Sequence, residues 1–254
     1  MGRNRNIYGA YLTIALILVP VWEMAARSSP RVRLLLSSPG RILEFSQSNS
    51  ADLFHATLIT GGEALAGMVL ATVVSLLLII IGMYFPRFLA FVLPATIASQ
   101  VIPLIVLAPF FVIAFGIGMT SKVAMAAVLC FFPTFIGFSQ GFRLISRETH
   151  DLLDVYDAKR TFRIYRVYLP LSLPSGMAGL KVSATLSVIG AIVAEFTGAE
   201  AGLGRNLFLS TIRLNPDLMM ASLLAAAALG AVMFGLVHLA ERILGKWYLT
   251  AGVS

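Results

Sequence analysis

The chain of 254 residues is poor in charge and in the residue types from which catalytic and metal sites are built. Only 12% of its residues are charged, and it has one cysteine and three histidines. A lone Cys130 excludes an internal disulfide framework and a CxxC redox or zinc site. His55, His150 and His238 show no metal-ligand spacing, so we expect no metal in this chain.

A nucleotide-binding P-loop is also missing. In the pattern GxxxxGK[ST] a glycine precedes the lysine, but Lys122, Lys159 and Lys181 lack it, and the pair Gly245-Lys246 is followed by Trp247. The chain therefore has no such loop for ATP phosphates. We expect it not to be an enzyme and to bind no cofactor, so that any ATP hydrolysis takes place in a separate partner.

Apolar residues dominate instead. They make up 58% of the chain, the mean hydropathy is +0.89, and runs of about 20 apolar residues are long enough to cross a bilayer. This predicts an all-α, polytopic membrane protein with about six transmembrane helices, and residues 1–254 as a single transmembrane domain without a soluble part. The expected spans are residues 7–26, 57–83, 88–114, 123–144, 175–197 and 218–240.

The basic residues are distributed in short segments between these runs. The formal net charge is +7, but scattered bases set membrane topology more simply than they bind nucleic acid, which we do not expect. The first run lacks a small-residue cleavage site, so we interpret it as a retained span. With both termini inside, eleven bases fall inside and seven outside, which favours that orientation. The seven are Arg27, Arg31, Arg33, Arg41, Lys122, Arg205 and Arg213.

One polar segment, residues 148–174, separates two apolar runs. It opens with acids and closes with bases, an order that suits a helix dipole, and its apolar residues allow one or two short amphipathic helices. Pro170 and Pro174 are expected to stop the helical pattern before the next span. Taken alone, the segment is also compatible with a solvated basic loop beside the membrane.

The 148–174 segment resembles the cytoplasmic EAA loop of the permeases of binding-protein-dependent ABC importers. Leu169-Pro170 and Leu173-Pro174 match the end of that pattern, and Ala158 stands at its alanine. Asp157 replaces the glycine of the family, and Asp151-Leu152-Leu153 replaces Glu-Ala-Ala. The resemblance implies a coupling helix that contacts a cytoplasmic ATPase. The residues expected to take part are Asp151, Asp154, Asp157, Ala158, Lys159, Arg160 and Pro170.

The resemblance extends over nearly the whole chain. Residues 190–204, with Glu195, Gly198, Gly202 and Gly204, look like the branch that serves nitrate, sulfonates, taurine, pyrimidine precursors and riboflavin. Three further segments fit the same branch: Trp22-Glu23, Ser38-Pro39 before a short helix, and Phe115 to Gly118 followed by Ser121-Lys122.

This likeness implies the type I importer permease fold in a bacterial or archaeal inner membrane. It also implies a second permease copy as a homodimer, two cytoplasmic ATPase subunits and an extracytoplasmic solute-binding protein. The 191–199 stretch is slightly more similar to the pyrimidine-precursor and riboflavin side than to the sulfonate side.

Three ionisable residues within spans are candidates for the transport pathway. Glu63 lies inside the second span, where an acid costs roughly 2.5–3.5 kcal/mol, so we expect it to face the dimer interior or a neighbouring helix and to accept hydrogen bonds from hydroxyl or amide groups. Lys181 is near the inner end of the fifth span and is placed to snorkel or to gate. Glu195 is expected to anchor a loop or to contact substrate.

Other patterns have more than one interpretation. Pro94, Pro103, Pro109 and Pro133 predict kinks in the middle spans, and the glycine pairs 137/141 and 176/179 indicate close helix packing. An ion-coupled secondary transporter remains an alternative, but the chain shows no inverted repeat and only Glu63 as a coupling acid. A membrane-embedded enzyme would need a catalytic motif such as HExxH, which does not occur.

Overall fold

The structure is a computed structural model that describes residues 18, 20–28, 32, 36–101 and 103–250. These residues form helices and no strand. The helices are α3 (Pro39–Ser48), α4 (Ser50–Tyr84), α5 (Pro86–Ser99), the 3-10 turn η1 (Leu104–Leu107), α6 (Ala108–Phe115), α7 (Met119–Arg143), α8 (Arg147–Val155), α9 (Arg160–Phe162), the π-helical turn η2 (Arg163–Tyr168), α10 (Leu169–Thr197), α11 (Leu203–Ile212) and α12 (Pro216–Thr250).

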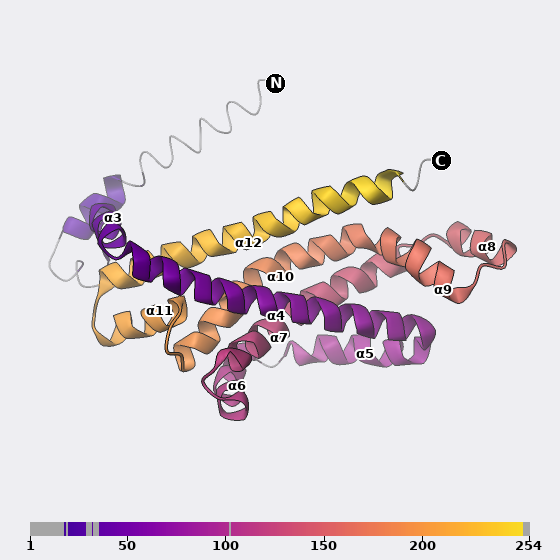
Figure 1. Cartoon of the computed structure of the whole chain (residues 1–254), viewed down its shortest axis with the longest axis horizontal. Helices are drawn as coiled ribbons and strands as arrows, with labels where there is room; N and C mark the ends of the chain where they lie inside the picture. Colours follow the sequence, from indigo (N-terminus) through magenta and orange to yellow (C-terminus); the bar gives the residue numbers. More distant parts are fainter. Residues whose placement is uncertain (1–17, 19, 29–31, 33–35, 102, 251–254) are drawn as a thin grey trace, which may run out of the picture.

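Long helices run side by side along the molecule, as Figure 1 shows. Within the described residues, four are long and apolar enough to cross a membrane: Ser50–Tyr84, Met119–Arg143, Arg160–Thr197 and Pro216–Gly245. They correspond to the second, fourth, fifth and sixth predicted spans, the fourth ending one residue earlier than predicted. The first predicted span, residues 7–26, lies mostly outside the described residues, although its described residues 20–26 are helical.

The third predicted span, residues 88–114, is wrong as a single helix. The chain forms two shorter apolar helices, α5 and α6, with a break before η1. Pro103 explains the break, because it has no N–H to donate and adopts an extended ψ of 98°. Together α5, η1 and α6 still return the chain from one end of the bundle toward the other (Figure 1).

The prolines of the 148–174 segment do not stop the helix as predicted. One continuous helical stretch runs from Arg160 to Thr197, with Pro170 in the first turn of α10 and Pro174 inside it. A proline ring normally clashes with the carbonyl four residues earlier. The π-helical turn η2 lies directly before Pro170 and widens the helix there, which gives the ring room.

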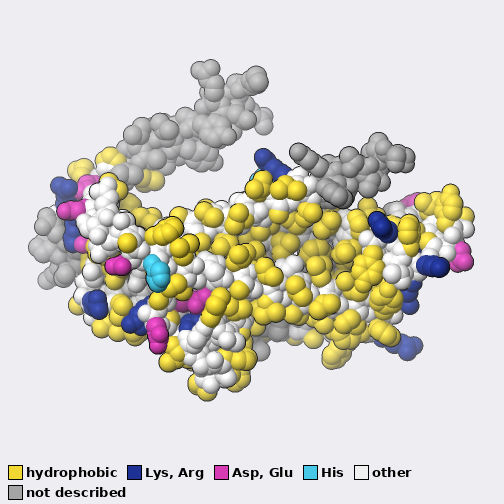
Figure 2. All heavy atoms as spheres, in the orientation of Figure 1, with side chains coloured by type: hydrophobic (Ala, Val, Ile, Leu, Met, Phe, Trp, Pro, Cys, Tyr) yellow, Lys and Arg dark blue, Asp and Glu magenta, His cyan; other side chains and the backbone are white. Residues whose placement is uncertain are grey.

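The two ends of the bundle carry different elements. At one end lie α8, α9 and the end of α4, and at the other lie α3, α11 and the start of α12 (Figure 1). We call these the α8 end and the α11 end. Large apolar side chains are exposed along the helices between them, and in Figure 2 the charged side chains gather toward the two ends. This distribution fits an apolar belt that faces lipid.

Candidate functional site

The 148–174 segment forms a compact unit at the α8 end. Ser146 caps α8 by accepting a hydrogen bond from the backbone N–H of Thr149 at 3.3 Å. Glu148, in the first turn, accepts bonds from its own N–H and from Ser146, and these bonds lower its pKa. The segment forms two helices, α8 and α9, and Asp154 falls in the last turn of α8, where it is paired with Arg163.

The backbone conformation at Asp157 explains why the EAA-loop pattern has a glycine at this position. Asp157 follows α8 with a φ of 45°, in the left-handed region that glycine adopts freely and that aspartate tolerates better than most residues. Its N–H donates to the carbonyl of Asp154 at 3.0 Å, and the N–H of Ala158 donates to the carbonyl of Leu153 at 3.0 Å. The Asp157 side chain is exposed, as are those of Asp151 and Lys159.

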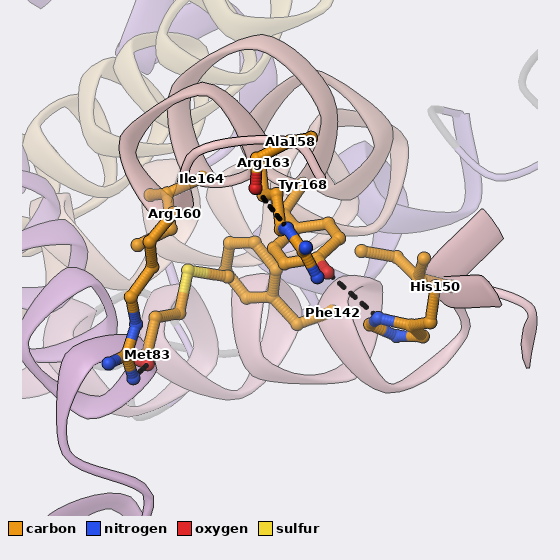
Figure 3. A pocket seen from close by; sticks show the side chains of 9 residues that line it. Met83, Phe142, His150, Ala158, Arg160, Arg163, Ile164 and Tyr168 are labelled. Carbon is orange, nitrogen blue, oxygen red and sulfur yellow. Dashed lines mark hydrogen bonds between the residues drawn. The ribbon is translucent and has the colours of Figure 1, made fainter. Parts of the chain in front are cut away.

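Arg160 fastens this unit to the rest of the bundle, and Arg163 holds the unit together (Figure 3). Arg160 donates to the carbonyls of Met83 and Tyr84 at 2.7 and 2.8 Å and lies over the Tyr84 ring, so it satisfies carbonyls at the C-terminal end of α4. Arg163 pairs with Asp154 and donates to the carbonyl of Ala158 at 2.7 Å. Arg160 thus links the start of α9 to the end of α4.

Three apolar side chains are exposed on α8 and just after it, beside the charged side chains of Arg147, Glu148, Asp151 and Asp154. Leu152, Val155 and Tyr156 are exposed, and Val155 is 82% exposed. Beneath them, a cavity of about 450 Å³ separates α8 from the ends of α4 and α7, and His150 and Tyr168 are hydrogen-bonded at 2.8 Å on its wall. Exposed apolar residues on a short polar unit are typical of a protein-binding surface.

A second group of polar side chains is buried toward the α11 end. Glu195, 1% exposed, accepts hydrogen bonds from the Thr60 hydroxyl at 2.7 Å and from the Gly204 N–H at 2.6 Å. Thr60 also accepts a bond from the N–H of Leu203 at 2.9 Å. Glu195 and Thr60 therefore satisfy the free N–H groups at the start of α11 and hold that helix against α4.

This contact accounts for two glycines of the 198–204 stretch, Gly202 and Gly204. Gly202 has a φ of 114°, and a Cβ there would collide with the Glu195 carboxylate. A Cβ on Gly204 would lie 2.7 Å from the Cβ of Glu195. Glycine is needed at these two positions because the backbone approaches the Glu195 side chain so closely that a Cβ would not fit.

Glu63 lies beside Glu195 and Lys122. Its side chain is 5% exposed and packed among helices, but its Oε2 has no hydrogen-bond partner among the described residues, in contrast to the expected hydroxyl or amide donors. The Glu195 carboxyl and the Lys122 ammonium are its charged neighbours. Lys122 is 3% exposed in the first turn of α7, where its Nζ donates to the carbonyl of Gly118 at 2.9 Å, and not in an outer loop as the charge count assumed.

Lys181 is separate from this cluster. Its Nζ lies 2.6 Å from Oε2 of Glu241 on α12, and the same oxygen is 3.2 Å from Nδ1 of His238. The structure thus brings Glu63 and Glu195 together and places Lys181 in a link between α10 and α12. Sequence reasoning missed Glu241 as its partner, because the two residues are far apart in the chain.

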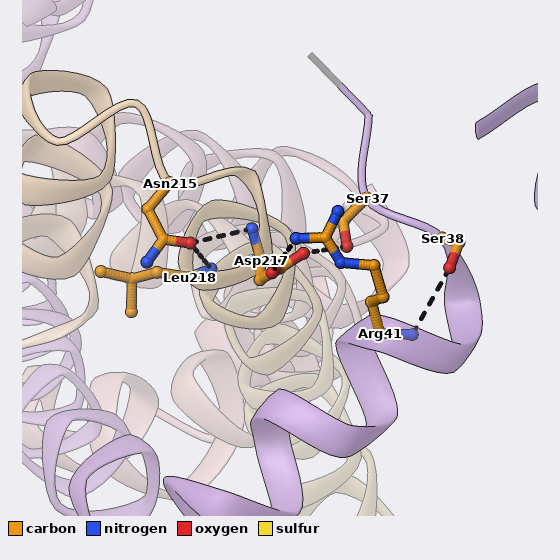
Figure 4. Close-up of polar contacts among 6 residues, drawn as sticks. All are labelled: Ser37, Ser38, Arg41, Asn215, Asp217 and Leu218. Carbon is orange, nitrogen blue, oxygen red and sulfur yellow. Dashed lines mark hydrogen bonds and ion pairs between the residues drawn. The ribbon is translucent and has the colours of Figure 1, made fainter. Parts of the chain in front are cut away.

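The start of α12 is tied to α3, a contact that sequence reasoning also missed (Figure 4). Asp217 accepts bonds from Ser37 and from Arg41, whose Nη2 lies 2.5 Å away. Asn215 caps α12 by accepting from the N–H groups of Asp217 and Leu218 at 3.1 Å. The sequence did contain a signal for the start of α12, because asparagine followed by proline is typical of a helix start.

An enzymatic interpretation finds no support in this arrangement. Residues 137–141 spell G-x-S-x-G, but that pattern marks a nucleophile only at a turn from a strand into a helix, and here it lies inside α7. Among the described residues, no group of three or more histidine, cysteine, aspartate or glutamate side chains is placed to hold a metal ion.

A bundle of membrane-length helices with a polar unit at one end defines a multi-pass membrane protein, and comparison with known proteins gives its family. Residues 75–249 match the family described as binding-protein-dependent transport system inner membrane component. The chain belongs to this family and is the permease subunit of an ABC importer. The expected recognition, fold class and general function are thereby confirmed.

Three relatives cover nearly the whole chain. The formylaminopyrimidine transport permease protein ThiX of Halalkalibacterium halodurans is 33% identical over 91% of this chain and 93% of its own length. The riboflavin transport system permease protein RibX of Chloroflexus aurantiacus is 31% identical over 94% and 90%. A putative aliphatic sulfonates transport permease protein, SsuC of Bacillus subtilis, is 25% identical over 97% and 90%.

Proposed function

We propose that the α8 end faces the cytoplasm and docks a separate ATPase, which binds ATP and drives transport through this chain. The observation that carries the proposal is the exposed apolar group Leu152, Val155 and Tyr156 on a unit that Arg160 fastens to α4. In this arrangement Asp151, Asp154, Asp157, Ala158 and Lys159 form or surround the contact surface. Pro170 marks the point where α10 begins and where motion of the unit enters the bundle.

The partners follow from the same proposal. A second copy of the permease completes the translocation pathway, and an extracytoplasmic binding protein delivers cargo at the α11 end. Both chain termini lie in the cytoplasm. Residues 1–254 act as one permease domain that contributes Glu63, Lys181 and Glu195 to its polar interior.

The cargo that we favour is a small nitrogen-containing organic solute on the pyrimidine-precursor or riboflavin side of the branch. The 33% and 31% identical relatives carry such names, and the sulfonate relative is 25% identical. Sulfonate, taurine or nitrate transport remains the second candidate.

Two-sided labelling tests the orientation. In a Cys130→Ser background, Lys159→Cys and Glu200→Cys each place one thiol at an exposed position on opposite ends of the bundle. We expect a membrane-impermeant thiol reagent added outside intact cells to label position 200 only. Position 159 should react only after the membrane is opened. Labelling of both positions from outside, or of position 159 alone, would reverse or refute the proposed topology.

A further inference from the structure

An apolar groove runs along α5, starting at the α8 end of the bundle. It has a volume of about 820 Å³ and lies between α5 and the last turns of α4 and α7. α5 begins beside the end of α4 (Figure 1), and the two helices meet at Gly82, where a Cβ would lie 2.9 Å from the Cβ of Leu89. The side chains that α5 contributes to the walls are Leu89, Ala90, Leu93, Pro94, Ile97 and Ala98.

The length of the groove matches one leaflet of a bilayer. Along α5 its lining runs from Leu89 to Ala98, which is about 14 Å at 1.5 Å per residue. The hydrocarbon core of a bilayer is about 30 Å thick, so that one leaflet contributes about 15 Å. The groove ends where α5 ends, at Ser99 before the break at Pro103. A lipid acyl chain that enters at the α8 end therefore fits the groove from the headgroup level to the middle of the bilayer.

Two arginines stand at the mouth of the groove. Arg143, the last residue of α7, is exposed and is the one charged residue in the lining. Arg87, in the first turn of α5, is also exposed, and it precedes Ala90 and Pro94 by three and seven residues, so it lies on the same face of the helix. Among the described residues neither arginine forms an ion pair. Two permanent positive charges are thus available to an anion at this level.

The charges distinguish a lipid from a second copy of the chain as the occupant. In a twofold dimer within one bilayer, a copy packed over the groove would bring its own Arg87 and Arg143 to the same depth as these two. Like charges at that depth repel each other. An anionic lipid instead brings a phosphate group to this depth, and a phosphate accepts paired hydrogen bonds from a guanidinium.

We propose that this groove binds one anionic phospholipid, with an acyl chain along α5 and the phosphate at Arg87 and Arg143. This is a binding site in addition to the proposed transport and ATPase docking. Met83 and Phe142 line both the groove and the cavity beneath α8. The lipid headgroup therefore lies beside the unit that Arg160 fastens to α4.

Quenching of tryptophan fluorescence by brominated lipids tests the site in the purified full-length permease. The two tryptophans of the chain, Trp22 and Trp247, are replaced by phenylalanine. Ile97→Trp then places one reporter in the groove, at a side chain that is 57% exposed. If this variant does not fold, Ala98→Trp takes its place.

The probes are phosphatidylglycerol, which is anionic, and phosphatidylcholine, which carries no net charge, both with the same brominated acyl chains. Each is diluted into membranes of unbrominated phosphatidylcholine that contain the reporter protein. We expect phosphatidylglycerol to bind next to position 97 at least about tenfold more tightly than phosphatidylcholine, because each of the two arginines attracts the anionic headgroup.

Control variants assign the preference to the groove and to its arginines. Leu77→Trp, at a side chain that is 54% exposed on α4 outside the groove, should show no preference between the lipids. In the Ile97→Trp protein, Arg143→Gln should lower the preference about fivefold, and the double variant with Arg87→Gln should abolish it. Arg242→Gln removes an exposed arginine from α12 and should leave the preference unchanged.

Four results would overturn the lipid site. They are equal binding of both lipids at position 97, the same preference at position 77 as at position 97, a preference that survives loss of both arginines, and an absence of quenching by either lipid at position 97. The last result would assign the groove to a second copy of the chain. The test uses neither ATPase nor cargo, so a failure of the proposed coupling leaves its outcome unaffected.

Discussion

Gly141→Val is expected to lower the midpoint of thermal unfolding by roughly 4–10 °C. Gly141 on α7 faces α10, and a Cβ there would lie 2.7 Å from the carbonyl oxygen of Ser172 and 2.8 Å from its Cα. These are backbone atoms, so the helices themselves must separate. Gly137, one turn earlier, is similarly close to the carbonyl of Ser175 at 2.9 Å. The glycine pattern in the sequence thus corresponds to a real helix contact.

Separation of these two helices is expected to disturb the 148–174 segment, because α7 leads into this segment and α10 leaves it. We therefore expect Gly141→Val also to reduce ATP-driven uptake. Gly235→Val on α12 is the matched control, since a Cβ at Gly235 meets nothing within 4 Å. The measurement is thermal unfolding of the purified protein in detergent. An equal loss in both variants, or none in Gly141→Val, would contradict close packing at this contact.

Val155→Asp is expected to reduce the ATPase that copurifies with the permease by at least about tenfold. Val155 is 82% exposed at the end of α8, so the substitution leaves packing within the chain unchanged. In the complex it would bury an unpaired charge in an apolar contact, which costs several kcal/mol. The measurement is the ratio of ATPase to permease after affinity purification of the tagged permease, together with ATP-driven uptake.

Leu214→Asp is the matched control for this substitution. Leu214 is 75% exposed and lies at the other end, after α11, with a φ of 49° that aspartate tolerates. The same change of residue type should leave ATPase copurification at the level of the unsubstituted protein. If Leu214→Asp releases the ATPase and Val155→Asp does not, the docking surface has been assigned to the wrong end.

The sequence allowed the membrane class and a polar segment between two long helices to be predicted for physical reasons. An apolar run of bilayer length has few alternatives to a spanning helix, and four such runs appear as four long helices. The prediction of a single third span was wrong because the apolar composition of residues 88–114 is continuous, whereas the helix is interrupted. Pro103 interrupts the helix without interrupting the apolar composition.

The prediction made from Pro170 and Pro174 was wrong in the opposite sense. They were expected to end a helix, yet the π-helical turn η2 carries the helix through Pro170. A local rule treats each proline by itself, whereas the structure adjusts the turn before it. At Asp157 the structure supplies a reason that the sequence lacked. Its left-handed φ explains why the family pattern has a glycine at this position.

The polar interior was the least predictable part. Glu63 and Glu195 were singled out separately as acids within spans, but nothing in the local pattern shows that they lie together. Lys122 was counted in a loop, although it is buried in the first turn of α7. Their association depends on how α4, α7 and α10 pack, and such long-range contacts leave no periodic signal. Two acids near the same predicted depth were the one clue available.

Cross-linking in assembled complexes tests most directly that a separate ATPase docks at the α8 end. Leu152→Cys, exposed on α8, and Glu200→Cys, exposed near α11, are each placed in a Cys130→Ser permease that is coexpressed with its ATPase and binding protein. A thiol-reactive cross-linker in opened membranes is predicted to join position 152 to the ATPase, while position 200 captures only the binding protein. Capture of the ATPase from position 200, or full uptake without any ATPase product from position 152, would contradict the account.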